Sequence, residues 1–408
     1  MSTSLSSVPA QDETPSDWRR YRALAAASFG LALGYSNIAI LCFGLFVVPL
    51  SAAYGWSRSE ISLAMGILLW LVVITGPSAG ALIDRFGARR ILIPSIILFA
   101  LAFASLALVN GRLWLFYAIH VALAVVGAGT LPSSYTHVIV GWFDKRRGLA
   151  LGITMAGVGI GGFFLPPYVQ ALLARGGLQT AYLGVAALVA LVCLPVVVLF
   201  LKEPPVPAGR QTSETSPLRE LFANPRFIKL ASAFFLLGLY TAGMLGHLVP
   251  LLVDRGVDPV FAAWTMSMLA ATLTLGRVFA GYLLDRFSPM IVVSVFLAAP
   301  VAGLVLLAGG ASGDVAIPSA ILLGFGIGAE FDFMCYLVSR YLPAQTYARN
   351  YGITYAAYAV GAGLGPILLS FSLEKLGAYA PALWLLCGTT LAAILILLTL
   401  GNYRRTSG

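Results

Sequence analysis

One basic residue lies deep inside a long apolar stretch of this sequence and is well suited to bind an anion. Arg277 comes eight residues before Asp285, the next charged residue. In a helix this spacing corresponds to roughly 12 Å along the axis. A guanidinium group stays charged and can bind a carboxylate through two parallel hydrogen bonds. The sequence therefore predicts that Arg277 binds an organic anion, with a structural ion pair as the alternative.

Two acids, Glu330 and Asp332, lie in another apolar stretch, ten and eight residues before Arg340. Asp332 is therefore expected at about the depth of Arg277. Residues two apart on a helix point in different directions, so we do not expect the acids to share one role. Our hypothesis is that Asp332 balances Arg277 in the empty protein and takes a proton when the anion binds. A permanent structural pair between Arg277 and either acid is the alternative.

The composition places the chain among membrane proteins. Apolar residues make up 59% of its 408 residues and charged residues only 10%, whereas a soluble domain carries about 25% charged residues. The mean hydropathy is +0.91. A helix needs about 20 apolar residues to cross the hydrocarbon core of a bilayer. Stretches such as 148–174, which contain no charge, meet that requirement.

Charged and Gly/Pro-rich breaks divide the chain into twelve apolar segments. These segments lie close to residues 22–50, 60–83, 90–109, 113–141, 148–174, 179–201, 228–253, 260–284, 289–309, 315–339, 350–373 and 379–400. The domain organisation that follows is a disordered cytoplasmic tail at 1–17, a six-helix bundle at 18–201, a cytoplasmic linker at 202–226 and a second six-helix bundle at 227–408.

The distribution of basic residues predicts the orientation in the membrane. Of the 25 Lys and Arg residues, 19 fall on one side of the segments, five on the other, and Arg277 within a helix. The positive-inside rule then places both termini in the cytoplasm and the chain in the inner membrane. The net charge of +9 is mostly topological and gives no reason to expect nucleic-acid binding. Membrane lipid is the expected surrounding.

The two halves of the chain repeat each other at an offset of about 200 residues, close to half its length. The stretch 80–86 (GALIDRF) corresponds to 281–287 (GYLLDRF), and 152–154 corresponds to 352–354. Transporters built from two parallel repeats bind substrate between the halves, near the middle of the bilayer. We therefore predict an all-α membrane protein with twelve transmembrane helices in two pseudo-symmetric six-helix bundles.

A charged motif follows the second apolar segment and returns in weaker form in the second half. Its residues are Gly80, Asp84, Arg85, Gly87, Arg89 and Arg90, and the partial copy in the second half contains Asp285 and Arg286. A carboxylate here can meet the positive end of a helix dipole, and arginines can hold the loop. The motif resembles the major facilitator signature, which implies that fold and a cytoplasmic gate. The alternative is a charge cluster that only sets the topology.

Further stretches resemble a narrower branch, the monocarboxylate porters and oxalate:formate antiporters, including bacterial members. They are 54–62, 142–150, 156–167, 247–256 and 328–341. This resemblance implies organic-anion transport, with the helix-8 arginine, here Arg277, holding the substrate carboxylate.

Two departures from these relatives limit the comparison. Oxalate antiporters carry a lysine in helix 11, where this chain has Tyr351, Tyr355 and Tyr358 instead. A single fixed cation suits a monoanion better than a dianion. Animal monocarboxylate porters pair a lysine in helix 1 with an aspartate one turn before the helix-8 arginine. This chain has no lysine in helix 1, and Leu273 lies one turn before Arg277. Their proton mechanism therefore cannot be transferred.

Several polar residues complete the predicted substrate site through hydroxyl, amide, imidazole or ring contacts. They are Tyr35, Asn37, Tyr336, Tyr355, Tyr358 and His247, for each of which packing is the alternative. Asp332 and Glu330 are the candidates for proton coupling.

The sequence as a whole predicts a secondary active transporter of a small organic monocarboxylate, with proton coupling as a hypothesis. Exchange of other organic anions and multidrug or organic-cation efflux are the alternatives, although the helix-1 and helix-4 segments contain no acid that would bind a cation. No arrangement of residues indicates an enzyme, a cofactor or a metal. The expected partners are the organic anion and protons, and the expected state is a monomer.

Overall fold

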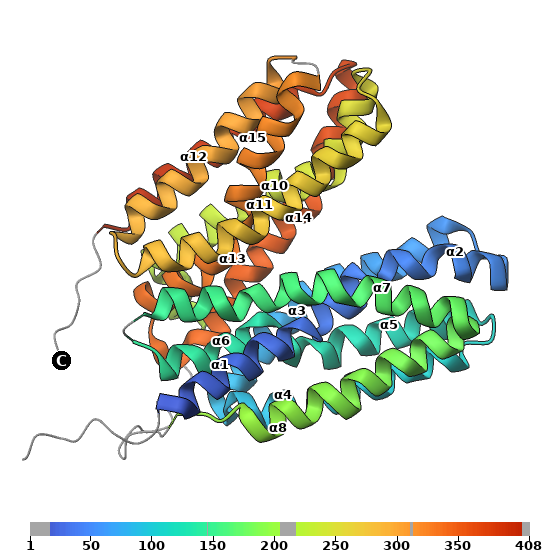
Figure 1. Cartoon of the computed structure of the whole chain (residues 1–408). Coiled ribbons are helices and arrows are strands. Elements are labelled where there is room, and N and C mark those ends of the chain that lie inside the picture. The colour runs from blue at the N-terminus through green and yellow to red at the C-terminus, as the bar shows by residue number, and fades with distance from the viewer. Residues whose placement is uncertain (1–16, 145, 205–217, 311–312, 402–408) are drawn as a thin grey trace, which may run out of the picture.

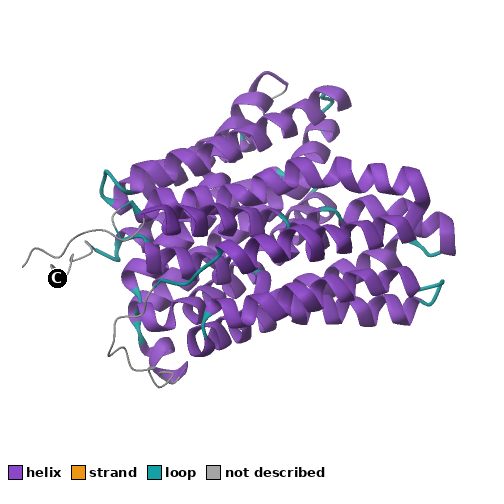
Figure 2. Ribbon diagram, turned by 60° about the horizontal axis from the view of Figure 1, so that its bottom comes forward, coloured by secondary structure: helices purple, strands orange, loops and turns teal. Residues whose placement is uncertain are grey.

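The computed structural model describes residues 17–144, 146–204, 218–310 and 313–401. Within these ranges every regular element is a helix, as Figure 2 shows. Residues 1–16 and 205–217, which include most of the predicted tail and linker, lie outside the described part of the chain.

The first half of the chain forms six helical passages, several of them composed of more than one element. The elements are α1 (Asp17–Ala32), η1 (Ser36–Leu41), α2 (Phe43–Tyr54), α3 (Arg58–Phe86), α4 (Ala88–Ser105), η2 (Leu106–Leu108), α5 (Leu113–Gly127), η3 (Ala128–Thr130), α6 (Pro132–Trp142), α7 (Arg147–Leu188), η4 (Val189–Cys193) and α8 (Leu194–Phe200).

The second half forms six more long helices. Its elements are α9 (Leu218–Ala223), α10 (Pro225–Asp254), α11 (Pro259–Leu284), α12 (Pro289–Ala308), η5 (Gly313–Val315), α13 (Ala316–Tyr341), η6 (Ala344–Thr346), α14 (Tyr347–Leu376) and α15 (Ala380–Leu398). Proline occupies the first turn of α10, α12 and α15, where the missing N–H costs no helical hydrogen bond.

The described residues contain eleven helical runs long and apolar enough to span a membrane. One of them, Arg147–Phe200, has 54 residues, far more than the roughly 20 that one crossing needs. Gly177 interrupts it with φ 66° and ψ −159°, and the chain turns back in Figure 1. This run therefore contains the fifth and sixth predicted helices, and the prediction of an all-helical fold with twelve membrane-length segments is confirmed.

Two of the predicted helices are interrupted inside the bundle. The segment 22–50 breaks into α1, η1 and α2, where the Asn37 side-chain amide donates to the carbonyl oxygens of Leu31 and Ala32 at 3.3 and 3.0 Å. The segment 113–141 breaks at Leu131, which is extended because Pro132 follows it. Irregular backbone is tolerated at membrane depth where protein groups satisfy its hydrogen bonds.

Figure 1 shows the two halves of the chain as two groups of helices that meet at one end and diverge toward the other. Across the junction α14 packs against α3, and α11 packs against α7. Gly161 and Gly361, which correspond to each other at the offset of the repeat, lie at helix crossings within their own halves. A Cβ on Gly161 would overlap the Ala32 carbonyl oxygen, and one on Gly361 would overlap that of Phe235. Corresponding glycines of the repeat thus allow the same close approach of two helix backbones in each half.

Candidate functional site

The two halves are joined at one end by a pair of equivalent helix caps. The Asp84 carboxylate accepts hydrogen bonds from the backbone N–H groups of Ala348 and Arg349, at 2.9 and 2.7 Å. The Asp285 carboxylate accepts from those of Gly148 and Leu149, both at 2.8 Å. In each case an acid from one half caps the first turn of a helix from the other half. Each carboxylate also faces the positive end of that helix dipole.

Glycines allow the backbones of the two halves to touch beside these caps. A Cβ on Gly148 would lie 2.7 Å from the Gly281 carbonyl oxygen. A Cβ on Gly352 would lie 2.8 Å from the Gly76 carbonyl oxygen, and one on Gly80 would overlap the Ala348 backbone. We call this junction of α3 with α14 and of α7 with α11 the Asp–Arg closure. Side chains at these glycines would push the halves apart.

Polar side chains cross the same end of the molecule. Arg340 on α13 donates to the Asp144 carboxylate at 2.9 Å, and Arg147 donates to the Ser339 carbonyl oxygen at 3.3 Å. Tyr336, predicted to bind substrate, donates to the Leu284 carbonyl oxygen at 3.4 Å. Its ring lies 5.5 Å from the Arg340 guanidinium carbon. The structure thus places Tyr336 beside the closure.

The remaining residues of the charged motif lie around the loops that follow α3 in the first half and α11 in the second. Arg89 donates from its backbone to Glu203 at 2.7 Å and from its side chain to the Val198 carbonyl oxygen at 2.6 Å. Gly87 has φ 90°, a conformation that favours glycine. Arg85 and Arg286 lie over the rings of Phe86 and Tyr282, and Arg90 is exposed.

Arg277 lies deeper between the halves and is only 6% exposed. Its Nη1 donates to the Met155 carbonyl oxygen on α7 at 2.8 Å. Its buried Nε has no hydrogen-bond partner among the described residues. No ion pair within 4.0 Å joins Arg277 to an acid in this part of the chain. The alternative interpretation of Arg277, a structural ion pair with Asp332 or Glu330, therefore has no counterpart among the described residues.

Glu330 is fully buried and its carboxylate is clamped by hydroxyl groups. Tyr240 donates to Oε1, and Thr241 lies 2.9 and 2.8 Å from the two carboxylate oxygens. Tyr358 of α14 lies close enough to this carboxylate to act on it electrostatically. Because three helices meet at this carboxylate, Glu330 fixes the packing of α10, α13 and α14.

Asp332 is also buried, with 1% of its surface exposed. Neither of its carboxylate oxygens has a hydrogen-bond partner in the described chain. The positive charge of Arg277 acts on both acids electrostatically. The two acids are only two residues apart, but their surroundings differ. The Glu330 carboxylate accepts hydrogen bonds, whereas the Asp332 carboxylate accepts none from the described residues. That the two acids do not share one role stays a prediction.

Tyrosines of α14 form a row beside these charged residues. The ring of Tyr355 lies 6.3 Å from Tyr351 and 6.1 Å from Tyr358, nearly parallel to both. Phe331 packs on Tyr355 and Tyr358, at 5.9 and 5.1 Å. Tyr358 is buried and within electrostatic range of Arg277, whereas Tyr355 is half-buried. Of the predicted tyrosines on α14, Tyr358 therefore lies within range of the arginine, and Tyr355 lies next to it in the row.

Tyr35 and Asn37, predicted to contact substrate, are occupied inside the first bundle. The Tyr35 hydroxyl donates to the Leu68 carbonyl oxygen at 3.2 Å, and the ring is fully buried. The Asn37 amide also donates to the Val158 carbonyl oxygen at 3.0 Å. Both side chains therefore hold the irregular first passage against its neighbours.

His247 lies near the opposite end of α10. Its Nε2 is 3.0 Å from the Ser370 hydroxyl, and its ring is 6.4 Å from that of Tyr379. Tyr379, outside the spanning segments, donates to Asp254 at 2.9 Å. Burial and this hydrogen bond raise the pKa of Tyr379 to about 12, so it stays a neutral donor. His247 therefore connects α10 to α14 away from Arg277.

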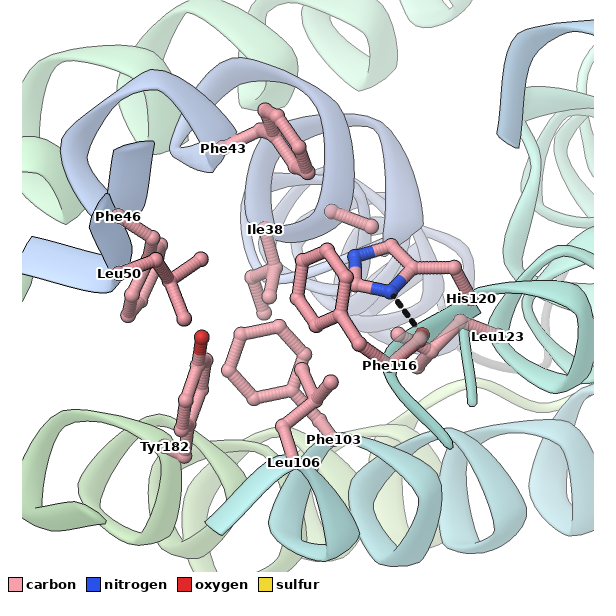
Figure 3. Close-up of a pocket in the computed structure, with 11 residues that line it drawn as sticks. Ile38, Phe43, Phe46, Leu50, Phe103, Leu106, Phe116, His120, Leu123 and Tyr182 are labelled. Atoms are coloured by element: carbon pink, nitrogen blue, oxygen red, sulfur yellow. Dashed lines mark hydrogen bonds between the residues drawn. The ribbon is translucent and has the colours of Figure 1, made fainter. Parts of the chain in front are cut away.

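A small apolar cavity inside the first bundle is a separate feature (Figure 3). Its volume is about 20 Å³, and it is lined mainly by Phe, Leu and Ile side chains with His120 and Tyr182. The His120 Nδ1 lies 2.7 Å from the Phe116 carbonyl oxygen. A space of this size holds about one water molecule. The cavity is therefore too small for an organic substrate.

Sequence reasoning missed several residues of this arrangement. Tyr240 and Thr241 form an adjacent polar pair within an apolar stretch, which could have identified them as partners for a buried acid. The Met155 carbonyl oxygen that accepts from Arg277 carried no such signal, because every residue has a carbonyl group. His137, 3.6 Å from the Asp84 carboxylate, was visible only as an isolated histidine.

The structure contains two repeated bundles of membrane-length helices that are joined at one end. The buried, positively charged side chain of Arg277 lies between them. This arrangement is that of a membrane transporter. The sequence matches the model of the Major Facilitator Superfamily over residues 24–366. The chain belongs to this superfamily and is a multi-pass secondary transporter.

Individual relatives and solved structures agree with this assignment. MFS-type transporter 1 of Ophiocordyceps sp. (strain BCC 1869) is 27% identical over 366 residues, covering 87% of this chain and 80% of that protein. The uncharacterized MFS-type transporter YhjX of Escherichia coli (strain K12) is 27% identical over 362 residues, covering 85% and 87%. The fucose:proton symporter FucP of E. coli has the same fold, with a TM-score of 0.76, 15% identity and coverage of 94% and 98%.

Proposed function

We propose that this chain carries a small organic monocarboxylate by alternating access, with Arg277 as the anchor for the carboxylate. The observation behind this proposal is a guanidinium that is 6% exposed and has no acid within 4.0 Å among the described residues. A buried charge without a partner is costly in a membrane protein and indicates a functional site. A substrate carboxylate would satisfy the Nε that has no partner.

The surroundings of Arg277 favour a monoanion with a flat or hydroxyl-bearing body. We expect Tyr358, and Tyr355 next to it in the row, to contact the rest of the substrate through hydroxyl groups or ring faces. A second carboxylate would need another fixed cation, and none lies in α14 between Arg349 and Glu374. We assign no direct substrate contact to Tyr35, Asn37, Tyr336 and His247, because their side chains hold neighbouring helices.

Alternating access requires the Asp–Arg closure to break and reform. We assign this gating role to Asp84 and Asp285, supported by their hydrogen bonds to the opposite half. With both termini cytoplasmic, as the basic residues predict, the structure would be closed toward the cytoplasm. FucP, also solved in an outward conformation, superimposes with a TM-score of 0.75 over 94% of this chain.

The relatives give limited support for the substrate class. Probable anion transporter 3, chloroplastic, of Oryza sativa subsp. japonica is 34% identical, but over only 36% of this chain and 30% of that protein. The Fujikurins efflux protein of Gibberella fujikuroi (strain CBS 195.34) is 28% identical over 75% of this chain, which supports efflux of a larger organic compound as the alternative.

Thermal unfolding of the purified protein with a panel of compounds tests the substrate class. The panel contains acetate, lactate, pyruvate and benzoate, the dicarboxylates malonate and oxalate, and cationic drugs. We expect a subset of the monocarboxylates to raise the Tm, because a ligand that binds only the folded state stabilises it. Stabilisation by the cations, or by none of the acids, would contradict the proposal.

Substitutions of the two capping acids test the gate. We expect Asp84→Asn or Asp285→Asn to weaken the closure by about 1 kcal/mol each, since each removes a charged cap from a helix N-terminus. Because the two caps lie on different helices, we expect the double variant to be close to additive.

Labelling of Cys335 with N-ethylmaleimide measures this opening. The thiol is fully buried beside the hydroxyls of Tyr347 and Thr136, from opposite halves. Faster labelling in the variants is expected, and Cys335→Ser provides the background from the other cysteines. Unchanged labelling in the double variant would rule out a gating role for these acids.

A further inference from the structure

We propose that the substrate of this carrier is an aromatic monocarboxylate, and that Phe331 of α13 and Tyr355 of α14 select it by packing against its ring. This inference rests on the proposed function, because it takes Arg277 as the anchor for the carboxylate. Phe331 is thereby a residue that determines specificity.

Phe331 is the one residue between positions 326 and 339 of α13 that is not buried. Helix α13 packs against α10, α11, α12 and α14 of its own half and against α7 of the other half. With 78% of its apolar stretch buried, the span that contains α13 is the most enclosed of the eleven. Because neighbouring helices separate α13 from lipid at this depth, the exposed part of the Phe331 ring faces the space between the two halves.

Tyr355 reaches the same space from α14. Gly352, three residues earlier, lies so close to α3 that a Cβ there would be 2.8 Å from the Gly76 carbonyl oxygen. Residues three apart share a helix face, so Tyr355 lies just past this crossing, where the halves begin to diverge in Figure 1. Its ring is half-buried, whereas that of Tyr351, one turn nearer the caps, is buried. Tyr355 also acts electrostatically on Tyr35 of the first half, which agrees with a position between the halves.

Phe331, Tyr355 and Tyr358 form a compact group of rings beside the arginine. The centroid of the Phe331 ring lies 5.9 Å from that of Tyr355 and 5.1 Å from that of Tyr358, and the two tyrosine rings are 6.1 Å apart. Tyr358 lies within electrostatic range of Arg277. The Nε of Arg277 has no hydrogen-bond partner among the residues that the structure describes. A carboxylate bound there would bring a ring attached to it against this group of rings.

The acid next to Phe331 holds that ring in place before a ligand arrives. The Glu330 carboxylate accepts hydrogen bonds from Tyr240 and Thr241 of α10. These bonds fix the rotation of α13 relative to α10, and therefore the direction in which Phe331 points. A side chain that is already ordered loses little freedom on binding, which lowers the cost of association.

The chemistry of these rings favours a flat aromatic ligand over an aliphatic one of the same size. Aromatic rings attract one another in offset or edge-to-face arrangements at centroid distances of about 4.5–7 Å, in addition to the gain from burying their surface. Phe331 already makes such contacts with both tyrosines, so a ligand ring would extend the same packing. A saturated ring has no π-face and would gain only from burial.

Calorimetric titration of the purified full chain with benzoate and cyclohexanecarboxylate tests this inference. The two acids have the same number of carbon atoms and are both ionised at neutral pH, but only benzoate is aromatic. For wild type we expect benzoate to bind about two- to tenfold more tightly, which is what an aromatic pair contributes beyond its burial. Lactate, which has no ring, is titrated in parallel.

Substitutions of the two proposed contacts should remove this preference. In Phe331→Leu and in Tyr355→Leu we expect the Kd of benzoate to rise until it is close to that of cyclohexanecarboxylate, whose own Kd changes little. Phe331→Tyr keeps a ring and should keep the preference. Phe325→Leu is the matched control, because Phe325 is also a half-buried ring on α13 but stacks on Phe296 of α12, at 4.4 Å. We expect this control to retain the wild-type ratio of the two Kd values.

The outcomes separate this inference from the proposed function. Binding of lactate but of neither ring acid, equal binding of the two ring acids by wild type, a preserved preference in Phe331→Leu or in Tyr355→Leu, or a lost preference in Phe325→Leu would each overturn the aromatic assignment and leave an anion carrier standing. If no acid binds wild type, the proposed function itself fails, and this inference with it. Phe331→Met and Tyr355→Met give the same test if a leucine variant does not fold.

Discussion

Replacing Arg277 with alanine is expected to abolish the rise in Tm that monocarboxylates produce in the wild-type protein. Removing one partner from a buried, hydrogen-bonded charge pair costs about 2–5 kcal/mol. This corresponds to a loss of affinity of roughly 30-fold or more. Thermal unfolding with and without each acid measures the effect, and uptake by proteoliposomes gives an independent reading.

Two further variants distinguish lost binding from lost folding. Arg277→Ala alone leaves Asp332 buried with no nearby cation, and this change can lower the stability of the protein by itself. The double variant Arg277→Ala/Asp332→Asn removes both charges and should regain stability without regaining ligand binding. Arg277→Lys keeps a charge but loses the planar fork, so we expect weak residual binding. Full stabilisation by the acids in Arg277→Ala would show that the anchor lies elsewhere.

The spans were predictable because membrane insertion imposes a simple rule on sequence. A helix must keep about 20 apolar residues together, and that signal survives whatever its neighbours are. The segment predicted at 289–309, for example, is observed at Pro289–Ala308. The break in the first helix was not predictable in this way, because it depends on Asn37 finding the Val158 carbonyl oxygen on α7.

The site was predictable only in part, for a related reason. A charge inside an apolar stretch is visible in the sequence, so Arg277, Glu330 and Asp332 could be found. Which acid is satisfied depends on the helix that packs beside it. Tyr240 and Thr241 reach Glu330 from α10, about 90 residues earlier in the chain. No local pattern contains that information.

The same distinction applies to the polar aromatic and histidine candidates. Tyr336 and Tyr355 both looked suitable for a ligand, yet Tyr336 contacts Leu284 at the closure and Tyr355 lies in the row of rings on α14. The difference is one of depth and direction within the assembled bundle. A single sequence indicates approximately how deep a residue lies in the membrane. It says little about which neighbouring helix the side chain faces, because that depends on how the helices pack.

Replacing Gly80 with leucine is expected to keep the Asp–Arg closure from forming and to stop transport. A Cβ at this position would overlap the Ala348 carbonyl oxygen and lie 2.8 Å from the Arg349 Cα. Both atoms belong to the backbone and cannot move aside as a flexible side chain would. Overpacking costs about 1–3 kcal/mol or more, enough to shift a two-state equilibrium roughly tenfold or further toward the open form.

Labelling of Cys335 and uptake by proteoliposomes measure the two consequences of this change. In Gly80→Leu we expect faster modification of Cys335 together with loss of uptake. Gly66→Leu is the matched control on the same helix, because a Cβ there meets nothing within 4 Å. Gly352→Leu, on the opposite side of the crossing, should reproduce the effect of Gly80→Leu. Wild-type labelling and uptake in Gly80→Leu would mean that the close contact of α3 with α14 is not needed for the transport cycle.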